Sequence, residues 1–246
     1  MRRAIIIGAS SGLGHEVAKI LIKDGWQIGI AARRLHLLEL LYKIAPDRVE
    51  MAAIDVTKSD SEETLMQLID RVGGCDMFFY ASGIGWQNPE LNADIELNTV
   101  QTNTMGFSRM IGAAYRYMAA HGGGHIVAIS SIAGTKGLGI APSYSATKAF
   151  QNTYLQALEQ LSNMQGHNIR FTDIRPGFVA TELLGDNPRY PLLMKTEPVA
   201  KSIVKAVYSG KHKVVIDARW AVITFFWRMA DEVTKALTGA GIWGVE

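Results

Sequence analysis

The sequence has little cysteine, little net charge and no long hydrophobic run. Its only cysteine, Cys75, excludes an internal disulfide bond and fits a reducing compartment. The 25 Lys and Arg residues nearly balance 23 Asp and Glu, so a net charge of +2 gives no general attraction to nucleic acid or to an anionic membrane. We therefore expect a cytoplasmic protein with no nucleic-acid partner and no metal site.

The apolar runs are too short for targeting or membrane insertion. The run before Gly8 covers only residues 4–7, below the ~7–15 residues of a signal-peptide core, and is better explained as a buried strand. The late run AVITFFW (221–227) is far below the ~20 residues that span a bilayer. The sequence thus predicts no transmembrane segment.

Proline is also scarce, with seven residues, and three of them fall in one segment. Residues 181–198 contain Gly185, Pro188, Pro191 and Pro198, which interrupt any regular period. Such an excursion is either a substrate-binding loop or a mobile surface connection. With no repeat, low-complexity tract or linker elsewhere, residues 1–246 are predicted to form one domain.

Short apolar runs alternate with segments of helical period, one of which opens with a capping pattern, Ser59 and Glu62. Because parallel neighbours need long crossovers, this alternation predicts an α/β fold, a doubly wound Rossmann-type domain with a parallel sheet of about seven strands flanked by helices. The predicted strands cover residues 4–7, 27–32, 49–56, 76–80, 125–130, 169–174 and 213–216.

A glycine-rich turn, GASSGLG, follows the first strand, before a helical pattern that starts at His15. Gly8, Gly12 and Gly14 allow a tight turn and close approach of a pyrophosphate to a helix N-terminus, where Ser10 and Ser11 add hydroxyl donors. The spacing differs from the commonest dinucleotide fingerprint, and a plain tight turn is the alternative.

The second strand ends in Ala31-Ala32-Arg33-Arg34, where a carboxylate would bind the ribose of NAD. The two arginines are instead candidates for a clamp on the 2′-phosphate of NADP, or else belong to a solvated loop. Asp55, after the third strand, either accepts a hydrogen bond from adenine or caps the turn at Thr57.

The motif YSATK (144–148) places a phenol and an ammonium group on one helix face, a spacing that alone is typical of any solvated helix. Together with GASSGLG, Asp55-Val56, Asn103, Ser131 and Pro176-Gly177, in this order, it makes the chain similar to the short-chain dehydrogenase/reductase family over nearly its whole length. No single motif is decisive, but the ordered set is specific.

The resemblance implies that Tyr144 exchanges a proton with the substrate oxygen, and that Lys148 favours its phenolate and binds the nicotinamide ribose. It also implies that Ser131 holds the substrate oxygen, with Ser130 as the neighbouring alternative, and that Asn103 helps to hold a water in the proton path. The implied residues for binding NADP(H) are Gly8, Ser10, Ser11, Gly12, Leu13, Gly14, Arg33, Arg34, Asp55, Val56, Ala81, Ser82, Gly83, Tyr144, Lys148, Pro176, Gly177, Val179 and Thr181.

The sequence departs from the family after the fourth strand. Tyr80-Ala81-Ser82-Gly83 replaces the usual Asn-Asn-Ala-Gly, which removes the asparagine that braces the sheet, and Ile7 stands where threonine is frequent. These changes concern sheet bracing and cofactor affinity more than the proton and hydride chemistry.

The resemblance implies an NADP-dependent oxidoreductase acting on a small-molecule carbonyl or secondary alcohol. The alternative is a nucleotide-binding regulatory or scaffold protein without turnover. The family also pairs two helices across a two-fold axis, so helices over 100–121 and 144–161 predict a homodimer or homotetramer. Their apolar faces include Met105, Phe107, Met110, Phe150, Tyr154 and Leu158.

An apolar substrate is suggested by the loop after Gly177 and by the C-terminal segment, about 218–246. Seven apolar residues of these two segments either line a substrate pocket or belong to the ordinary core, and the sequence favours neither interpretation. They are Leu183, Leu184, Leu192, Leu193, Met194, Phe225 and Phe226. The aromatic run 220–229 is expected to make a subunit contact or a lid rather than to bind a membrane interface.

Overall fold

A computed structural model describes residues 2–185 and 190–229. All seven predicted strands form, in one parallel sheet of order β3-β2-β1-β4-β5-β6-β7, which confirms the predicted fold class. Their bounds are β1 Arg3–Ile7, β2 Gln27–Ala32, β3 Val49–Ala53, β4 Met77–Tyr80, β5 Gly124–Ile129, β6 Ile169–Pro176 and β7 Lys213–Ile216.

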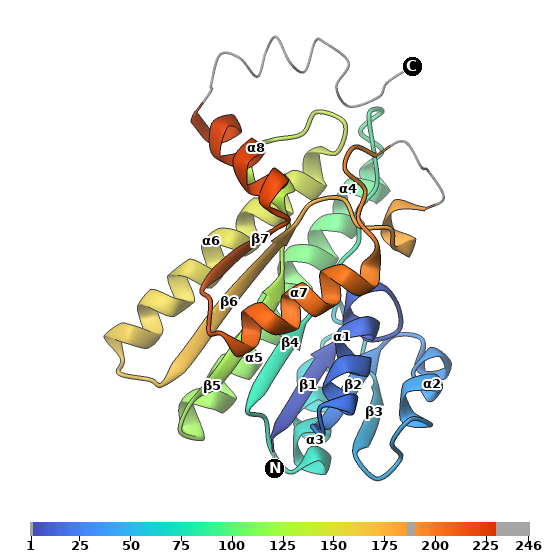
Figure 1. Ribbon diagram of the computed structural model, residues 1–246, viewed down its shortest axis with the longest axis vertical. Coiled ribbons are helices and arrows are strands. Elements are labelled where there is room, and N and C mark those ends of the chain that lie inside the picture. The colour runs from blue at the N-terminus through green and yellow to red at the C-terminus, as the bar shows by residue number, and fades with distance from the viewer. Residues whose placement is uncertain (1, 186–189, 230–246) are drawn as a thin grey trace.

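Helices cover both faces of the sheet (Figure 1). One apolar cluster joins the sheet to α1, α2 and α7, and a second joins it to α3, α5 and α6. The α-helices are α1 Gly12–Lys23, α2 Glu39–Tyr42, α3 Ser61–Val72, α4 Ala93–Val100, α5 Phe107–Ala120, α6 Pro142–Met164, α7 Thr196–Tyr208 and α8 Ala218–Met229. Shorter turns are η1 Leu35–Leu37, the π-helical η2 Gln101–Gly106, η3 Ile132–Thr135 and η4 Glu182–Leu184.

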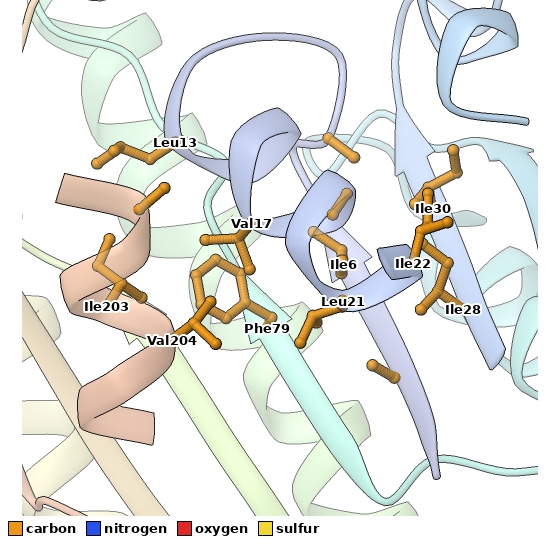
Figure 2. Close-up of a cluster of buried hydrophobic side chains, with 14 of the residues drawn as sticks. Ile6, Leu13, Val17, Leu21, Ile22, Ile28, Ile30, Phe79, Ile203 and Val204 are labelled. Atoms are coloured by element: carbon orange, nitrogen blue, oxygen red, sulfur yellow. The ribbon is translucent and has the colours of Figure 1, made fainter. Parts of the chain in front are cut away.

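The packing of α1 against α7 and the sheet fixes the position of α1 along the strands. Val17 and Leu21 of α1 meet Val204 of α7 and Phe79 of β4 in a fully apolar layer (Figure 2). Each such buried side chain contributes on the order of 1.5–3 kcal/mol. The layer therefore fixes the N-terminus of α1 at the carboxyl ends of the central strands.

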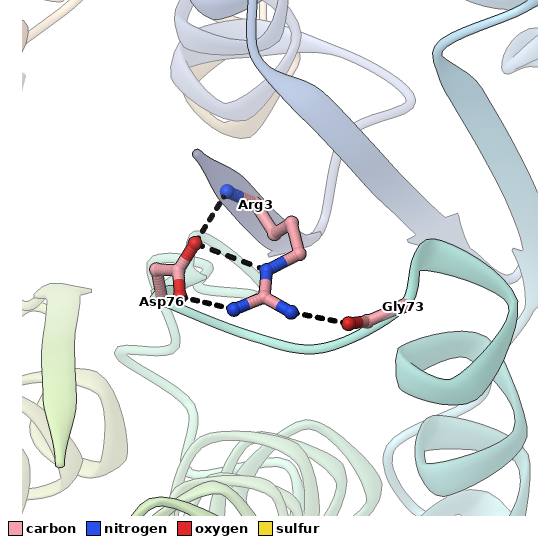
Figure 3. A network of polar contacts seen from close by, with 3 residues as sticks. All are labelled: Arg3, Gly73 and Asp76. Atoms are coloured by element: carbon pink, nitrogen blue, oxygen red, sulfur yellow. Dashed lines mark hydrogen bonds and ion pairs between the residues drawn. The ribbon is translucent and has the colours of Figure 1, made fainter. Parts of the chain in front are cut away.

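Register places the carboxyl ends of the central strands at one level. Ile7 of β1 pairs with Ala31 on β2 and with Tyr80 on β4. The order reverses between β1 and β4, the switch point at which open α/β sheets bind ligands. At the amino ends of the same strands, Arg3 donates to the Asp76 carboxylate through its backbone N–H and its guanidinium. The guanidinium also donates to the carbonyl of Gly73 (Figure 3).

Two local predictions are wrong. Helix α3 begins at Ser61 after Asp60, because a turn that bonds Ser61 Oγ to the Lys58 carbonyl precedes it, so Ser59 does not cap this helix. Helix α1 begins at Gly12 rather than His15.

The predicted excursion 181–198 is partly helical. It contains the short turn η4, and its last residues belong to α7, where Pro198 lies in the first turn and its missing N–H is tolerated.

The predicted interface helices also need correction. Phe107 and Met110 are fully buried in the core between α5 and the sheet, so they are not available to a second subunit. Met105 and Phe150 are exposed, and Tyr154 and Leu158 are partly buried against the core.

No helix within residues 2–185 and 190–229 has both the length and the apolar character needed to cross a membrane.

Candidate active site

The glycine turn is built as its sequence predicts. Gly8 has φ +87°, and a Cβ there would lie 2.6 Å from the backbone nitrogen of Ser82. A Cβ on Gly14 would lie 2.2 Å from the Gly8 carbonyl oxygen. Ser11 is the N-cap of α1 and makes no side-chain cap hydrogen bond, and Leu13 is buried beneath the turn. The first turn of α1 thus presents backbone N–H groups toward the sheet edge.

The two arginines after β2 are both exposed and have different neighbours. The positive charge of Arg33 contributes to lowering the pKa of Asp55. Arg34 forms an ion pair with Glu182, Nη2 to Oε2 2.9 Å. Glu182 was not among the predicted site residues.

Asp55 makes the turn contacts that its sequence allowed. Its Oδ1 accepts hydrogen bonds from Thr57 N at 3.0 Å and Thr57 Oγ1 at 2.7 Å. Burial raises the pKa of Asp55, but these bonds and Arg33 outweigh it and the pKa lies below its ordinary value. Val56 is buried against Gly106 of η2, where a Cβ would lie 2.7 Å from Val56 Cγ2.

The segment after β4 replaces amide bracing by aromatic packing. Tyr80 is fully buried, with its ring edge-on to Phe107 at 5.1 Å between centroids. The Ala81 N–H donates to the Ile7 carbonyl at 2.8 Å, which continues the β1 to β4 ladder. A Cβ on Gly83 would lie 3.3 Å from Asn103 Oδ1, a tight contact, and 3.6 Å from Lys148 Nζ, so Gly83 lies directly against both groups.

Asn103 lies in the π-helical turn η2 and is fully buried. Its side-chain amide accepts from Ile84 N at 2.9 Å and donates to Ile84 O at 2.7 Å. It also donates to Thr147 Oγ1 at 3.2 Å, and its main-chain carbonyl accepts from Gln151 Nε2 at 2.8 Å. Asn103 therefore joins the segment after β4 to helix α6.

Tyr144 and Lys148 lie one turn apart near the start of α6, where Pro142 takes the N-terminal position that suits it. Lys148 is buried, and its Nζ donates to Gln151 Oε1 at 3.0 Å and to the Ile129 carbonyl at 3.2 Å. Nζ lies 5.7 Å from the centroid of the Tyr144 ring. Burial lowers the pKa of Lys148 to about 8, against the opposing charge of Asp173.

Ser131 is buried after β5, and its Oγ accepts from Ala133 N at 3.0 Å. Burial raises the pKa of Tyr144 above its ordinary value, and a hydrogen bond with Ser131 opposes the shift. The lowered phenol pKa expected from Lys148 is therefore not produced by the protein residues, because burial of the phenol dominates. Ser130, the alternative, instead donates to Asp173 and, at 3.2 Å, to the Ile174 carbonyl.

The turn after β6 closes the other side of the site. Gly177 N donates to the Ile216 carbonyl at 2.8 Å, so Pro176-Gly177 is held against β7. Val179 is buried and pairs with Met194 across the loop. Thr181 lies over the glycine turn, since a Cβ on Gly12 would be 3.3 Å from Thr181 Cγ2.

The aromatic C-terminal run is not one surface. Trp220 is buried against Gly177, where a Cβ would lie 2.1 Å from Trp220 Nε1, and its ring is edge-on to Phe178 at 5.5 Å. Phe225 and Phe226 are exposed on α8. Of the suggested pocket residues in the loop, Leu183 and Leu193 are exposed, and Met194 packs on the core. The rest of the predicted C-terminal segment, residues 230–246, lies outside the described residues.

Sequence reasoning missed several residues that contact the predicted groups. Thr147 and Gln151 lie three positions beyond Tyr144 and Lys148 on α6, a spacing that would have identified them. Gly85 packs under the phenol, because a Cβ there would lie 2.3 Å from Tyr144 Cδ2. No local pattern marks Gly85 or Glu182.

The sequence matches known proteins along most of its length. Residues 2–190 match the family described as short chain dehydrogenase. An uncharacterized oxidoreductase from Myxococcus xanthus is 33% identical, covering 97% of this chain and 95% of its own.

Solved structures share the fold at low sequence identity. An alcohol dehydrogenase from Thermococcus sibiricus complexed with 5-hydroxy-NADP has a TM-score of 0.76 at 23% identity, covering 88% of this chain and 96% of its own. A 3-ketoacyl-(acyl-carrier-protein) reductase from Brucella melitensis complexed with NADH has a TM-score of 0.78 at 22% identity, with the same coverage of 88% and 96%.

Proposed function

We propose that this chain, which belongs to the short-chain dehydrogenase family, is an oxidoreductase. It would transfer a hydride between NADP(H) and a carbonyl compound or secondary alcohol. One observation carries the proposal: the Tyr144 phenol hydrogen-bonds Ser131, and Lys148 Nζ lies 5.7 Å from the Tyr144 ring centroid. Asn103 is hydrogen-bonded to Thr147, which lies between Tyr144 and Lys148 on α6. A protein that only bound a nucleotide would have no need of a phenol hydrogen-bonded to a serine beside a buried ammonium group.

The residues present fit a dinucleotide. Gly8 and Gly83 line the approach to the switch point, and a Cβ on either would meet backbone or side-chain atoms there. The N-terminus of α1 and the hydroxyls of Ser10 and Ser11 suit a pyrophosphate. When bound, the nicotinamide would supply or accept the hydride.

Tyr144 would donate its phenolic proton to the carbonyl oxygen while Ser131 holds that oxygen in place. Burial raises the pKa of Tyr144 above its ordinary value, so the phenol is in the protonated form that this donation requires. Lys148, held by Gln151 and Ile129, would return the proton and hold the ribose through its ammonium group. Asn103 would keep the segment after β4 in register with α6 and help to hold a water there.

Arg33 and Arg34 support NADP(H) over NAD(H). Both follow β2, whose end carries no acidic residue of its own, and a guanidinium can bind a phosphate through two charge-assisted hydrogen bonds. One such bond is worth ~1.5–3 kcal/mol, or roughly 10- to 150-fold in affinity. The fold alone does not choose, since similar structures are complexed with either an NADP derivative or NADH.

We further propose that the enzyme is cytoplasmic and acts as a homodimer or homotetramer on an apolar substrate. The buried single cysteine, Cys75, fits a reducing compartment. Met105 and Phe150 are exposed on the helices that would pair across a two-fold axis. Phe178, Tyr190 and Trp220 pack together beside Gly177 and would form an apolar wall of the substrate site.

The test is consumption of NADPH and of NADH with a panel of ketones, aldehydes and quinones. We expect turnover, with kcat/KM for NADPH at least about tenfold above that for NADH and falling toward parity in Arg33→Ala and, less so, Arg34→Ala. Binding of NADPH without turnover of any carbonyl would favour a regulatory or scaffold role. Equal use of NADH would remove the assignment of NADP.

A further inference from the structure

An ion pair connects the proposed 2′-phosphate clamp to the loop after β6. Arg34 follows β2, and Glu182 begins η4, yet Arg34 Nη2 lies 2.9 Å from Glu182 Oε2. The side chains of Arg34 and Glu182 are 51% and 64% exposed, so the pair is open to solvent and to competing anions.

The Glu182 carboxylate lies among groups that would otherwise bind cofactor phosphates. The hydrogen bond from Arg34 is the largest cause that lowers the pKa of Glu182; slight burial opposes it, and Ser11 also hydrogen-bonds the carboxylate. Thr181, the preceding residue, packs on Gly12 in the same turn. An ionised carboxylate thus sits between the glycine turn and the arginine, where an anion is favoured.

We propose that Glu182 is a specificity-determining residue that competes with the 2′-phosphate of NADP(H) for Arg34. The inference rests on the proposed function, since it assumes that Arg34 receives this phosphate. The N–H of Arg34 Nη2 that donates to the carboxylate is not available to a phosphate, which is left the other N–H donors of the guanidinium and faces the charge of Glu182. Either Glu182 moves away when the dinucleotide binds, or its charge repels the phosphate; both weaken binding of the 2′-phosphorylated form.

Arg33 provides an internal contrast. It stands beside Asp55, whose pKa its charge helps to lower, and Asp55 is already engaged by two hydrogen bonds from Thr57. Competition by Glu182 is therefore specific to Arg34. Glu182 reduces the preference for NADPH without abolishing it.

The experiment measures binding of 2′,5′-ADP and of 5′-AMP, which lacks only the 2′-phosphate, to the purified full-length protein by calorimetry. The variants are Glu182→Gln, Arg34→Met and the double variant. Because exposed ion pairs are worth little, we expect 2′,5′-ADP to bind about two- to fivefold more tightly to Glu182→Gln, with a smaller change for 5′-AMP. In the Arg34→Met background, Glu182→Gln should no longer favour 2′,5′-ADP over 5′-AMP.

Glu50→Gln is the matched control. Glu50 is also a glutamate in an ion pair, with Arg71, and its side chain is 41% exposed, but it lies near the start of β3, away from the glycine turn. This variant loses the same charge and should leave both dissociation constants unchanged.

Two failures can be told apart. If wild type prefers 2′,5′-ADP but Glu182→Gln binds this ligand no more tightly than wild type does, the competition is refuted and the proposed cofactor stands. If wild type binds both ligands equally and Arg34→Met changes neither, Arg34 is no phosphate clamp, and the NADP assignment falls together with the inference.

Discussion

Burial of the Lys148 ammonium group makes the stability of the protein depend on pH in a defined direction. Lys148 has a pKa of about 8 in the folded chain, below its ordinary value of 10.5, because burial disfavours its charge more than Asp173 favours it. Between these two values the unfolded chain binds more protons at Lys148 than the folded chain does. The free energy of unfolding should therefore rise with pH across this window.

The magnitude follows from proton linkage. Where only the unfolded state is protonated at Lys148, the slope approaches about 1.4 kcal/mol per pH unit. From about pH 7.5 to about pH 9.5, a fall of the lysine pKa from 10.5 to about 8 on folding predicts a gain of about 2 kcal/mol in the free energy of unfolding. Other groups titrate in this range, so Lys148 has to be isolated by difference.

Lys148→Met supplies that difference, because methionine has similar length and no charge. We expect the free energy of unfolding of wild type, measured by denaturant titration without cofactor, to gain about 2 kcal/mol on the variant over this pH range. Lys201→Met, at an exposed position on α7, is the control and should show no comparable gain. A pH-independent difference between wild type and Lys148→Met would refute the lowered pKa of Lys148 in the folded chain.

Three further predictions concern catalysis and assembly. Tyr144→Phe should bind NADPH nearly as wild type does and lose about 10²–10⁴-fold in kcat, because the ring still packs but the proton donor is gone; near-normal turnover would contradict the mechanism. Gly85→Ala should lower kcat by about ten- to a hundredfold with a smaller effect on NADPH affinity, since its Cβ would lie 2.3 Å from Tyr144 Cδ2 and must displace the ring; an unchanged kcat would show that Gly85 does not position the phenol. Light scattering at micromolar concentration should give the mass of two or four chains, and the mass of one chain would exclude pairing through α5 and α6.

The fold was predictable because its signals are local. The central strands β1 and β4 are short apolar runs, and burial on both faces of a parallel sheet makes such runs continuous. That Tyr144 and Lys148 share one helix face could also be predicted from the sequence, because a separation of four residues places two side chains on the same face of any helix.

The faces of the helix before α5 could not be predicted by the same rule. The π-helical turn Gln101–Gly106 adds a residue to the helical repeat, so the faces on its two sides are out of phase. Met105 is exposed within the turn, whereas Phe107 just beyond it is fully buried. A uniform period over 100–121 therefore assigned Phe107 and Met110 to an interface when they belong to the core.

Contacts between the ends of different strands were also beyond sequence reasoning. Arg34 and Glu182 are 148 positions apart, and an exposed ion pair is too weak to leave a pattern in the chain. Gly85 and Tyr144 meet only because the segment after β4 crosses the first turn of α6, joined to it through Asn103 and Thr147. Because these contacts depend on how loops cross rather than on helix or strand period, substitutions at Gly85 and Glu182 test the arrangement of the site, whereas those at Tyr144 and Lys148 test its chemistry.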